Sequence, residues 1–125
     1  MLELRPVDFN QVQHWFVDFQ KKSKCFELPP EEAEFIGIYL DSVLVGYFAL
    51  VGYEDGTLEI NQGYLQPIAR HKALSYASMK MIHTNAKLLG FKKIILKASR
   101  SLKSYTRFMH NLGFKPESII FSREI

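Results

Sequence analysis

The residues of this chain that could do chemistry gather at a predicted helix start, Arg70-His71-Lys72, which the small residues Ala73 and Ser75 follow closely. Residues 60 to 116 include no Asp or Glu, yet they hold eleven of the sixteen Lys and Arg residues. Unpaired backbone N–H groups at a helix N-terminus and the helix dipole both favour an anion. We therefore expect a phosphate-bearing ligand at this helix start.

The distribution of charge along the chain supports this expectation. Residues 1 to 59 carry eleven acids and four bases, whereas the segment that follows is purely basic. Such a dipolar chain can steer an anionic ligand toward one face. The alternative is an uneven but solvated lysine surface without a ligand.

Composition limits the kind of protein this can be. With 125 residues and 47% hydrophobic content, the sequence predicts a single domain over residues 1–125. It has no apolar run of membrane-spanning length and no signal-peptide pattern, so we expect a cytoplasmic protein without a membrane partner. The single cysteine, Cys25, excludes an internal disulfide, and the four histidines lack metal-ligand spacing, so no metal site is predicted.

The first part of the chain predicts a strand, a helix and a three-stranded meander. A short strand over residues 2–5 precedes Asp8, a helix cap with Gln11 three residues later. The helix of three to four turns places Phe9, Val12, Phe16 and Phe19 on one face. A polar connection of little or no helix leads to strands over residues 35–40, 43–53 and 57–65, separated by the turn signals Asp41-Ser42 and Asp55-Gly56.

The second part predicts alternating helices and strands. A helix begins near His71, buries Leu74, Ala77, Ser78, Met81, Ile82, Leu88 and Leu89, and ends at Gly90. A strand over residues 92–98, a helix ending at Gly113 and a last strand over 114–125 follow. The order is β-α-β-β-β-α-β-α-β, an α/β fold with a mixed, mostly antiparallel sheet flanked by helices.

This order, together with Leu65 at a strand end, Pro67 and the helix-opening run Arg70-His71-Lys72-Ala73-Leu74-Ser75, resembles the GNAT superfamily of N-acetyltransferases. Those proteins carry an Arg/Gln-x-x-Gly-x-Gly/Ala loop, whose backbone N–H groups hold the pyrophosphate of acetyl-CoA. The run from Arg107 to Phe114 resembles the penultimate helix of the family, which ends in Leu-Gly-Phe. The resemblance extends to short GNAT-like proteins of bacteriophages and implies a GNAT-like, acyl-CoA N-acyltransferase fold.

The resemblance implies an acetyl-CoA site formed by the strand end and the helix start. Its residues would be Tyr64, Leu65, Arg70, His71, Lys72, Ala73, Leu74 and Ser75. Ala73 and Ser75 replace the glycines of the family, which allow the backbone to approach a phosphate closely. Alanine and serine are the smallest replacements, and serine adds a hydroxyl donor.

The resemblance also implies candidates for acid–base chemistry. Amide formation from a thioester needs a neutral amine, so a base must accept a proton from the substrate. Glu59 has the spacing from Arg70 of the catalytic glutamate in histone-acetylating members of the family; the alternative is an outward-facing residue of an alternating strand. Met109 replaces the usual acid, a tyrosine, and Tyr105 one turn earlier is the substitute.

The function predicted in this way is acetyl-CoA-dependent N-acetylation of a primary amine. The acceptor could be a small molecule or a peptide, and the acidic residues near the polar connection would suit a cationic amine; they are Glu27, Glu31, Glu32 and Glu34. One alternative is a GNAT-shaped protein with a binding or structural role, a phage role included. The last strand could supply a homodimer contact.

The second alternative is a nucleic-acid-binding module. Its phosphate contacts would come from Lys92, Lys93, Lys97, Arg100, Lys103 and Arg107, and its stacking residues would be Tyr64, Tyr76 and Tyr105. No helix-turn-helix, zinc finger or RNP-like pattern accompanies these residues.

Overall fold

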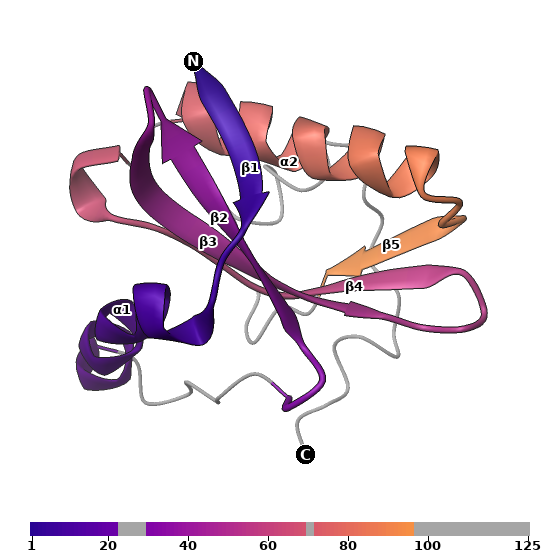
Figure 1. Ribbon diagram of the computed structural model, residues 1–125, viewed down its shortest axis with the longest axis horizontal. Helices are drawn as coiled ribbons and strands as arrows, with labels where there is room; N and C mark the ends of the chain where they lie inside the picture. Colours follow the sequence, from indigo (N-terminus) through magenta and orange to yellow (C-terminus); the bar gives the residue numbers. More distant parts are fainter. Residues whose placement is uncertain (23–29, 70–71, 97–125) are drawn as a thin grey trace.

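The computed structural model describes residues 1–22, 30–69 and 72–96, apart from the side chains of residues 17–22 and Lys72. The described elements are β1 (Leu2–Pro6), α1 (Phe9–Lys22), β2 (Glu34–Leu40), β3 (Val43–Gly52), β4 (Thr57–Leu65), the 3-10 helix η1 (Pro67–Ala69), α2 (Lys72–Leu88) and β5 (Lys93–Leu96) (Figure 1). The predicted order is confirmed as far as β5. The predicted helix and strand after residue 98 lie outside the described residues.

The five strands form one sheet in the order β1-β2-β3-β4-β5. All neighbouring pairs are antiparallel except β4 and β5, which are parallel because α2 returns the chain along the sheet. The turn between β2 and β3 consists of Asp41 and Ser42, with φ angles of 50° and 69°. A two-residue hairpin of this type needs positive φ at both positions, and Asp tolerates that region better than most residues.

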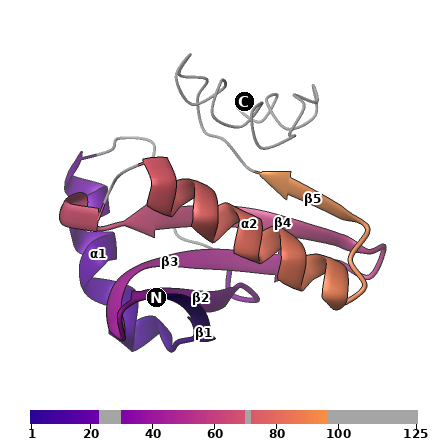
Figure 2. The ribbon, with the colours of Figure 1, turned by 90° about the horizontal axis from the view of Figure 1, so that it is seen from above.

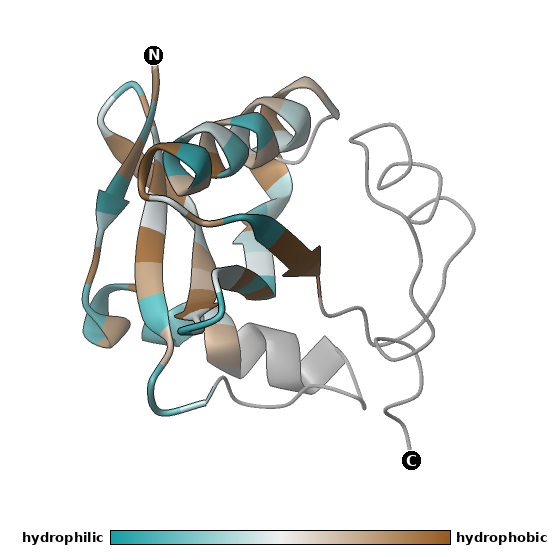
Figure 3. Cartoon of the chain, turned by 90° about the vertical axis from the view of Figure 1, so that its right-hand side faces the viewer, coloured by the Kyte–Doolittle hydropathy of each residue, from teal (hydrophilic) through white to brown (hydrophobic). Residues whose placement is uncertain are grey.

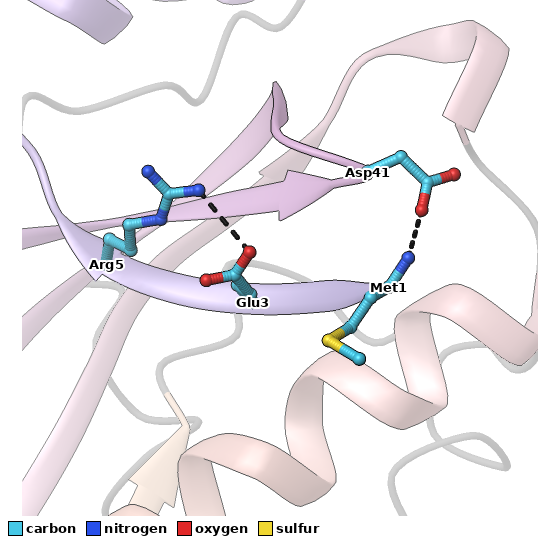
Figure 4. Close-up of polar contacts among 4 residues, drawn as sticks. All are labelled: Met1, Glu3, Arg5 and Asp41. Atoms are coloured by element: carbon cyan, nitrogen blue, oxygen red, sulfur yellow. Dashed lines mark hydrogen bonds and ion pairs between the residues drawn. The ribbon is translucent and has the colours of Figure 1, made fainter.

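The start of β1 is held against this turn. The backbone N–H of Asp41 donates to the carbonyl of Met1 at 2.9 Å, and the amino group of Met1 contacts the Asp41 carboxylate (Figure 4). On the same strand, Arg5 lies 3.4 Å from a carboxylate oxygen of Glu3 and places its guanidinium 4.3 Å from the centre of the Tyr39 ring. These contacts are exposed, so each contributes little to stability on its own.

The first helix begins as its sequence predicts. The backbone N–H of Asp8 donates to the side-chain oxygen of Gln11 at 3.0 Å, which is one half of a capping box. Val12 and Phe16 are buried, as the spacing predicts, and Trp15 is also buried although it lies outside the predicted stripe. Trp15 therefore adds to the buried side of α1 that the spacing of the Phe residues indicated.

The sheet separates two hydrophobic clusters, because alternate residues of a strand point to opposite faces. Tyr47 of β3 belongs to the cluster of α1, which we call the aromatic face, whereas the next residue, Phe48, belongs to the cluster of α2. The cluster of α2 is mainly aliphatic and includes Leu58 and Ile60 of β4. Glu59 lies between these two residues, so its side chain points toward the aromatic face.

The predicted buried face of α2 is partly wrong. Leu74, Ser78 and Ile82 are buried, but Leu88 and Leu89 are 80% and 77% exposed. The cluster of α2 instead includes Met79 and ends at Ala86, whereas Leu88 is the last residue of the helix and Leu89 lies in the turn after it. The buried Ser78 hydroxyl donates to the Leu74 carbonyl at 2.8 Å, so this polar group is satisfied within the helix.

Gly90 ends α2 as predicted. Its φ is 93°, the Gly90 N–H donates to Lys87 O at 3.1 Å, and the Phe91 N–H donates to Ala86 O at 3.0 Å. These two bonds form a Schellman motif, which satisfies carbonyls that the helix end leaves unpaired. The chain then enters β5, whose hydropathy rises from Lys93 toward its end (Figure 3).

Strands β3 and β4 approach each other very closely at Gly46. This residue pairs with Leu65, and a Cβ atom at Gly46 would lie 2.1 Å from the carbonyl oxygen of Tyr64. No real Cβ contact is that short, and the atom it would meet is backbone. Glycine at this position therefore allows the end of β4 to approach β3 this closely.

We expect Gly46→Ala to lower the free energy of unfolding by about 2 kcal/mol, because the two strands must move apart. Thermal denaturation and urea titration would measure the change. Gly52→Ala on the same strand is the control, since its Cβ would lie 3.2 Å from the ring edge of Phe91, a side chain that can shift. Equal losses in the two variants would contradict this account of Gly46.

Candidate active site

Glu59 is a buried carboxylate on β4. It is 7% exposed, and its neighbours in the sheet register are Val51 of β3 and Ile95 of β5. The Tyr53 hydroxyl donates to Glu59 Oε1 at 3.0 Å, and the Asn61 side-chain amide donates to Glu59 Oε2 at 2.8 Å. The alternative of an outward-facing strand residue is therefore wrong.

A β-bulge at Asn61 lies between Glu59 and the second part of β4. Leu50 pairs with Ile60, whereas the preceding residue of β3, Ala49, pairs with Gln62, so Asn61 is an extra residue in β4. A bulge re-aims side chains and increases the local twist of the strand. Here it coincides with the residue that donates to Glu59, and nothing in the sequence signals it.

The described part of β5 lies beside the first residues of β4. In the described part of the chain, β5 pairs with β4 only from Thr57 to Ile60, the residue before the bulge (Figure 2). Beyond this point β4 runs on to Leu65, and η1 and α2 follow. The buried carboxylate and the start of α2 thus lie on one continuous segment of chain, with the bulge between them.

The start of α2 combines small side chains with an absence of acidic residues. Its first turn contains no acidic residue, Ala73 is exposed and Ser75 is half-buried. Leu74, also predicted to bind the cofactor, is 5% exposed and belongs to the cluster of α2, so its contribution to a ligand would come from its backbone. Arg70 and His71 lie outside the described residues, as does the side chain of Lys72.

The predicted site residues at the end of β4 differ in burial. Leu65 is half-buried, whereas the Tyr64 ring is 9% exposed and lies against Trp15 at 5.4 Å and Tyr47 at 5.9 Å between ring centres. The buried Tyr64 ring is not exposed for stacking on a nucleic-acid base. Tyr105, the candidate acid, lies outside the described residues.

A second polar contact lies on the aromatic face beyond the bulge. The hydroxyl of Tyr47 donates to the side-chain oxygen of Gln62 at 3.0 Å, and no part of Tyr47 is exposed. Burial raises the pKa of Tyr47 far above its usual range, and Tyr64 adds to the shift. Burial therefore favours the neutral hydroxyl of Tyr47, which is the form that donates to Gln62.

Tyr53, like Asn61, is a residue of this site that the sequence analysis missed. It follows β3, is 46% exposed, and reaches Glu59 across the hairpin. The hydrogen bond to Glu59 raises the pKa of Tyr53, followed in size by burial and by the charges of Glu59, Glu32 and Asp55. Its only sequence signal is its place six residues before Glu59 with the Asp55-Gly56 turn between them.

The described residues contain no group of three or more His, Cys, Asp or Glu side chains that could hold a metal ion. None of the described helices is long and apolar enough to cross a membrane.

Comparison with known proteins identifies the class of this fold. No protein-family model and no curated protein matches the sequence. Among solved structures, YycN from Bacillus subtilis, a proposed acetyltransferase, matches with a TM-score of 0.76 at 14% identity over 100% of this chain and 99% of that one. Ribosomal-protein-alanine N-acetyltransferase from Brucella melitensis matches with a TM-score of 0.67 at 12% identity over 93% of each chain.

A third match is a proposed acyl-CoA N-acyltransferase from Klebsiella pneumoniae, with a TM-score of 0.66 at 17% identity over 89% of this chain and 81% of that one. All three similarities extend over most of both chains. The chain therefore has the α/β fold of the GNAT acetyltransferases, as its element order predicted. At these identities the similarity establishes the fold alone.

The contact between Tyr53 and Glu59 can be tested by titration. Ionised Tyr53 would lose its hydrogen bond and face a carboxylate, so removing that charge favours ionisation. We expect Glu59→Gln to lower the pKa of Tyr53 toward that of an ordinary tyrosine. NMR of ring-labelled tyrosine, assigned by its loss in Tyr53→Phe, would measure the change; an unchanged Tyr53 titration would contradict the contact.

Proposed function

We propose that this protein is an acetyl-CoA-dependent N-acetyltransferase that acts on a primary amine. The observation that supports the proposal most directly is the buried Glu59 carboxylate, held by two donors on the strand that leads to the start of α2. A buried and ordered carboxylate is the kind of group that accepts a proton from an amine. The fold of the acetyltransferases supports the same conclusion.

The residues at the start of α2 fit the pyrophosphate of acetyl-CoA. The exposed Ala73 is small, the half-buried Ser75 carries a hydroxyl donor, and the first turn contains no carboxylate to repel a phosphate. N–H groups of a first helical turn and the helix dipole supply further attraction. Tyr64, Leu65, Arg70, His71, Lys72 and Leu74 complete the proposed site.

Acetyl-CoA, when bound, supplies the acetyl group in an activated thioester. The part of the protein is to orient the amine and to accept its proton. Glu59 Oε1 and Oε2 each accept one hydrogen bond from the protein, so each oxygen keeps a second lone pair for the amine. Orientation by itself supplies a large part of the rate in a reaction of two bound molecules. Tyr105 is the proposed donor to the departing thiolate.

Binding of acetyl-CoA is the first expectation from this proposal. In calorimetry near 150 mM salt, where surface charges are largely screened, we expect one saturable site per chain. Ala73→Glu should abolish binding, since it places bulk and negative charge at the pyrophosphate. A carboxylate in a first helical turn stabilises the helix, so the fold should persist.

Thr84→Glu is the matched control, because Thr84 is exposed on the same helix and the change in charge is the same. We expect its affinity for acetyl-CoA to equal that of the wild-type protein. An undiminished affinity of Ala73→Glu would remove the start of α2 from the proposed site.

The role of Glu59 gives a second expectation. Glu59→Gln keeps the size and much of the hydrogen bonding of the side chain but cannot accept a proton. We expect kcat to fall by about 100-fold or more, with the affinity for acetyl-CoA unchanged. CoA release with spermidine and with a lysine-containing peptide would measure the rate; a variant as fast as the wild-type protein would exclude Glu59 as the base.

The alternative of nucleic-acid binding stays a prediction. Lys92 and Lys93 are exposed on the described surface, but the other predicted phosphate contacts lie outside the described residues. Affinity from such contacts falls steeply with salt and does not respond to acetyl-CoA. A GNAT-shaped binding protein without catalysis would show neither acetyl transfer nor this salt dependence.

A further inference from the structure

We propose that Tyr53 is a positioning residue for Glu59, which fixes the orientation of the carboxylate together with Asn61. The inference rests on the proposed function, because the role of Glu59 as base gives its orientation a purpose. Nothing in the resemblance to the GNAT superfamily predicts either of these partners.

The two donors bind different oxygens of the Glu59 carboxylate. Tyr53, the residue after β3, donates to Oε1 at 3.0 Å, and Asn61, in the bulge of β4, donates to Oε2 at 2.8 Å. A carboxylate held through one oxygen can still rotate about its last torsion, whereas a donor at each oxygen fixes that rotation. The remaining lone pairs of Glu59 then point in a constant direction.

The burial of Glu59 shows why these donors matter. Glu59 is 7% exposed, and the described residues include no Lys, Arg or His in an ion pair with it. A buried carboxylate whose oxygens lack donors is costly, so its place inside the fold depends on hydrogen bonds. Tyr53 and Asn61 are the donors that the described chain provides to Glu59.

Two further carboxylates affect the ionisation of the Tyr53 hydroxyl. Glu32, before β2, and Asp55, in the hairpin turn, both disfavour ionisation of the Tyr53 hydroxyl. Both charges therefore favour the neutral hydroxyl, which is the form that donates to Glu59. In the sheet register Glu59 lies beside the apolar residues Val51 and Ile95, which offer it no donor from their side chains.

The hydroxyl of Tyr53 is not needed to close the hairpin. The Tyr53 N–H donates to Thr57 O at 2.9 Å, the Gly56 N–H donates to Tyr53 O at 3.1 Å, and the Thr57 N–H donates to Asp55 Oδ1 at 2.9 Å. All three bonds use the backbone of Tyr53 or lie beside it. Tyr53→Phe keeps the ring and these bonds, so it removes one donor from Glu59 and little else.

The test is a double-mutant cycle in the acetyl-transfer assay with acetyl-CoA and an amine that the wild-type protein accepts. We expect Tyr53→Phe to lower kcat about tenfold, the loss typical of one hydrogen bond to a charge, with the KM for acetyl-CoA unchanged. In the Glu59→Gln background the same substitution should change kcat less than about twofold.

Two further variants keep the test sharp. Asn61→Ala removes the donor to the other oxygen and should behave as Tyr53→Phe does, so the test does not depend on the folding of one variant. Tyr39→Phe is the matched control, since Tyr39 lies on the same sheet beside Arg5 and away from Glu59. We expect its kinetics to equal those of the wild-type protein.

The outcomes separate this inference from the proposed function. If the wild-type protein transfers acetyl groups and Tyr53→Phe is as fast, the positioning role is wrong and the proposed function stands. Equal losses from Tyr53→Phe in both backgrounds would show a general structural effect and would also overturn the inference. If the wild-type protein releases no CoA with spermidine or a lysine-containing peptide, the proposed function and this inference fail together.

Discussion

One extra residue in β4 is the constraint on which the candidate site depends. Strand β3 offers a partner to Ile60 and to Gln62 but none to Asn61 between them. The resulting bulge turns the Asn61 amide toward Glu59. Local strand geometry thus sets the orientation of the carboxylate.

The two faces of the sheet give the site different surroundings. Glu59 shares the aromatic face with Tyr47 and Tyr64, while the start of α2 is anchored by aliphatic residues on the opposite face. Leu74 in the first turn of α2 belongs to that aliphatic cluster, so the same burial that stabilises the fold fixes the helix start. The proposed anion site is consequently formed by backbone that packing holds in place, with exposed small side chains around it.

Most of the fold could be predicted from local sequence signals. Asp8 and Gln11 mark the start of α1, Asp55-Gly56 marks a hairpin and Gly90 ends α2, because each signal acts within a few residues of chain. The burial of Leu88 and Leu89 was predicted wrongly because helical spacing does not reveal where the sheet beneath a helix ends.

The candidate site was less predictable from the sequence, because its contacts depend on how the strands pair. Glu59 could be singled out by its spacing from Arg70, but its burial depends on partners from other strands. Tyr53 and Asn61 become its donors only through the register of β3 against β4. No residue type in the sequence indicates that register. Periodicity predicts which residues face the core, while hydrogen bonds between strands depend on pairings that only the folded sheet defines.

The position of Trp15 has a practical consequence. It is the single tryptophan of the chain, 6% exposed, and its ring lies near Tyr47 and Tyr64 on the aromatic face. Indole emission is sensitive to the polarity around the ring, and nearby tyrosines transfer excitation energy to it. The protein thus carries an intrinsic fluorophore that reports the docking of α1 on the sheet, and unfolding of this face could be followed by light without any label.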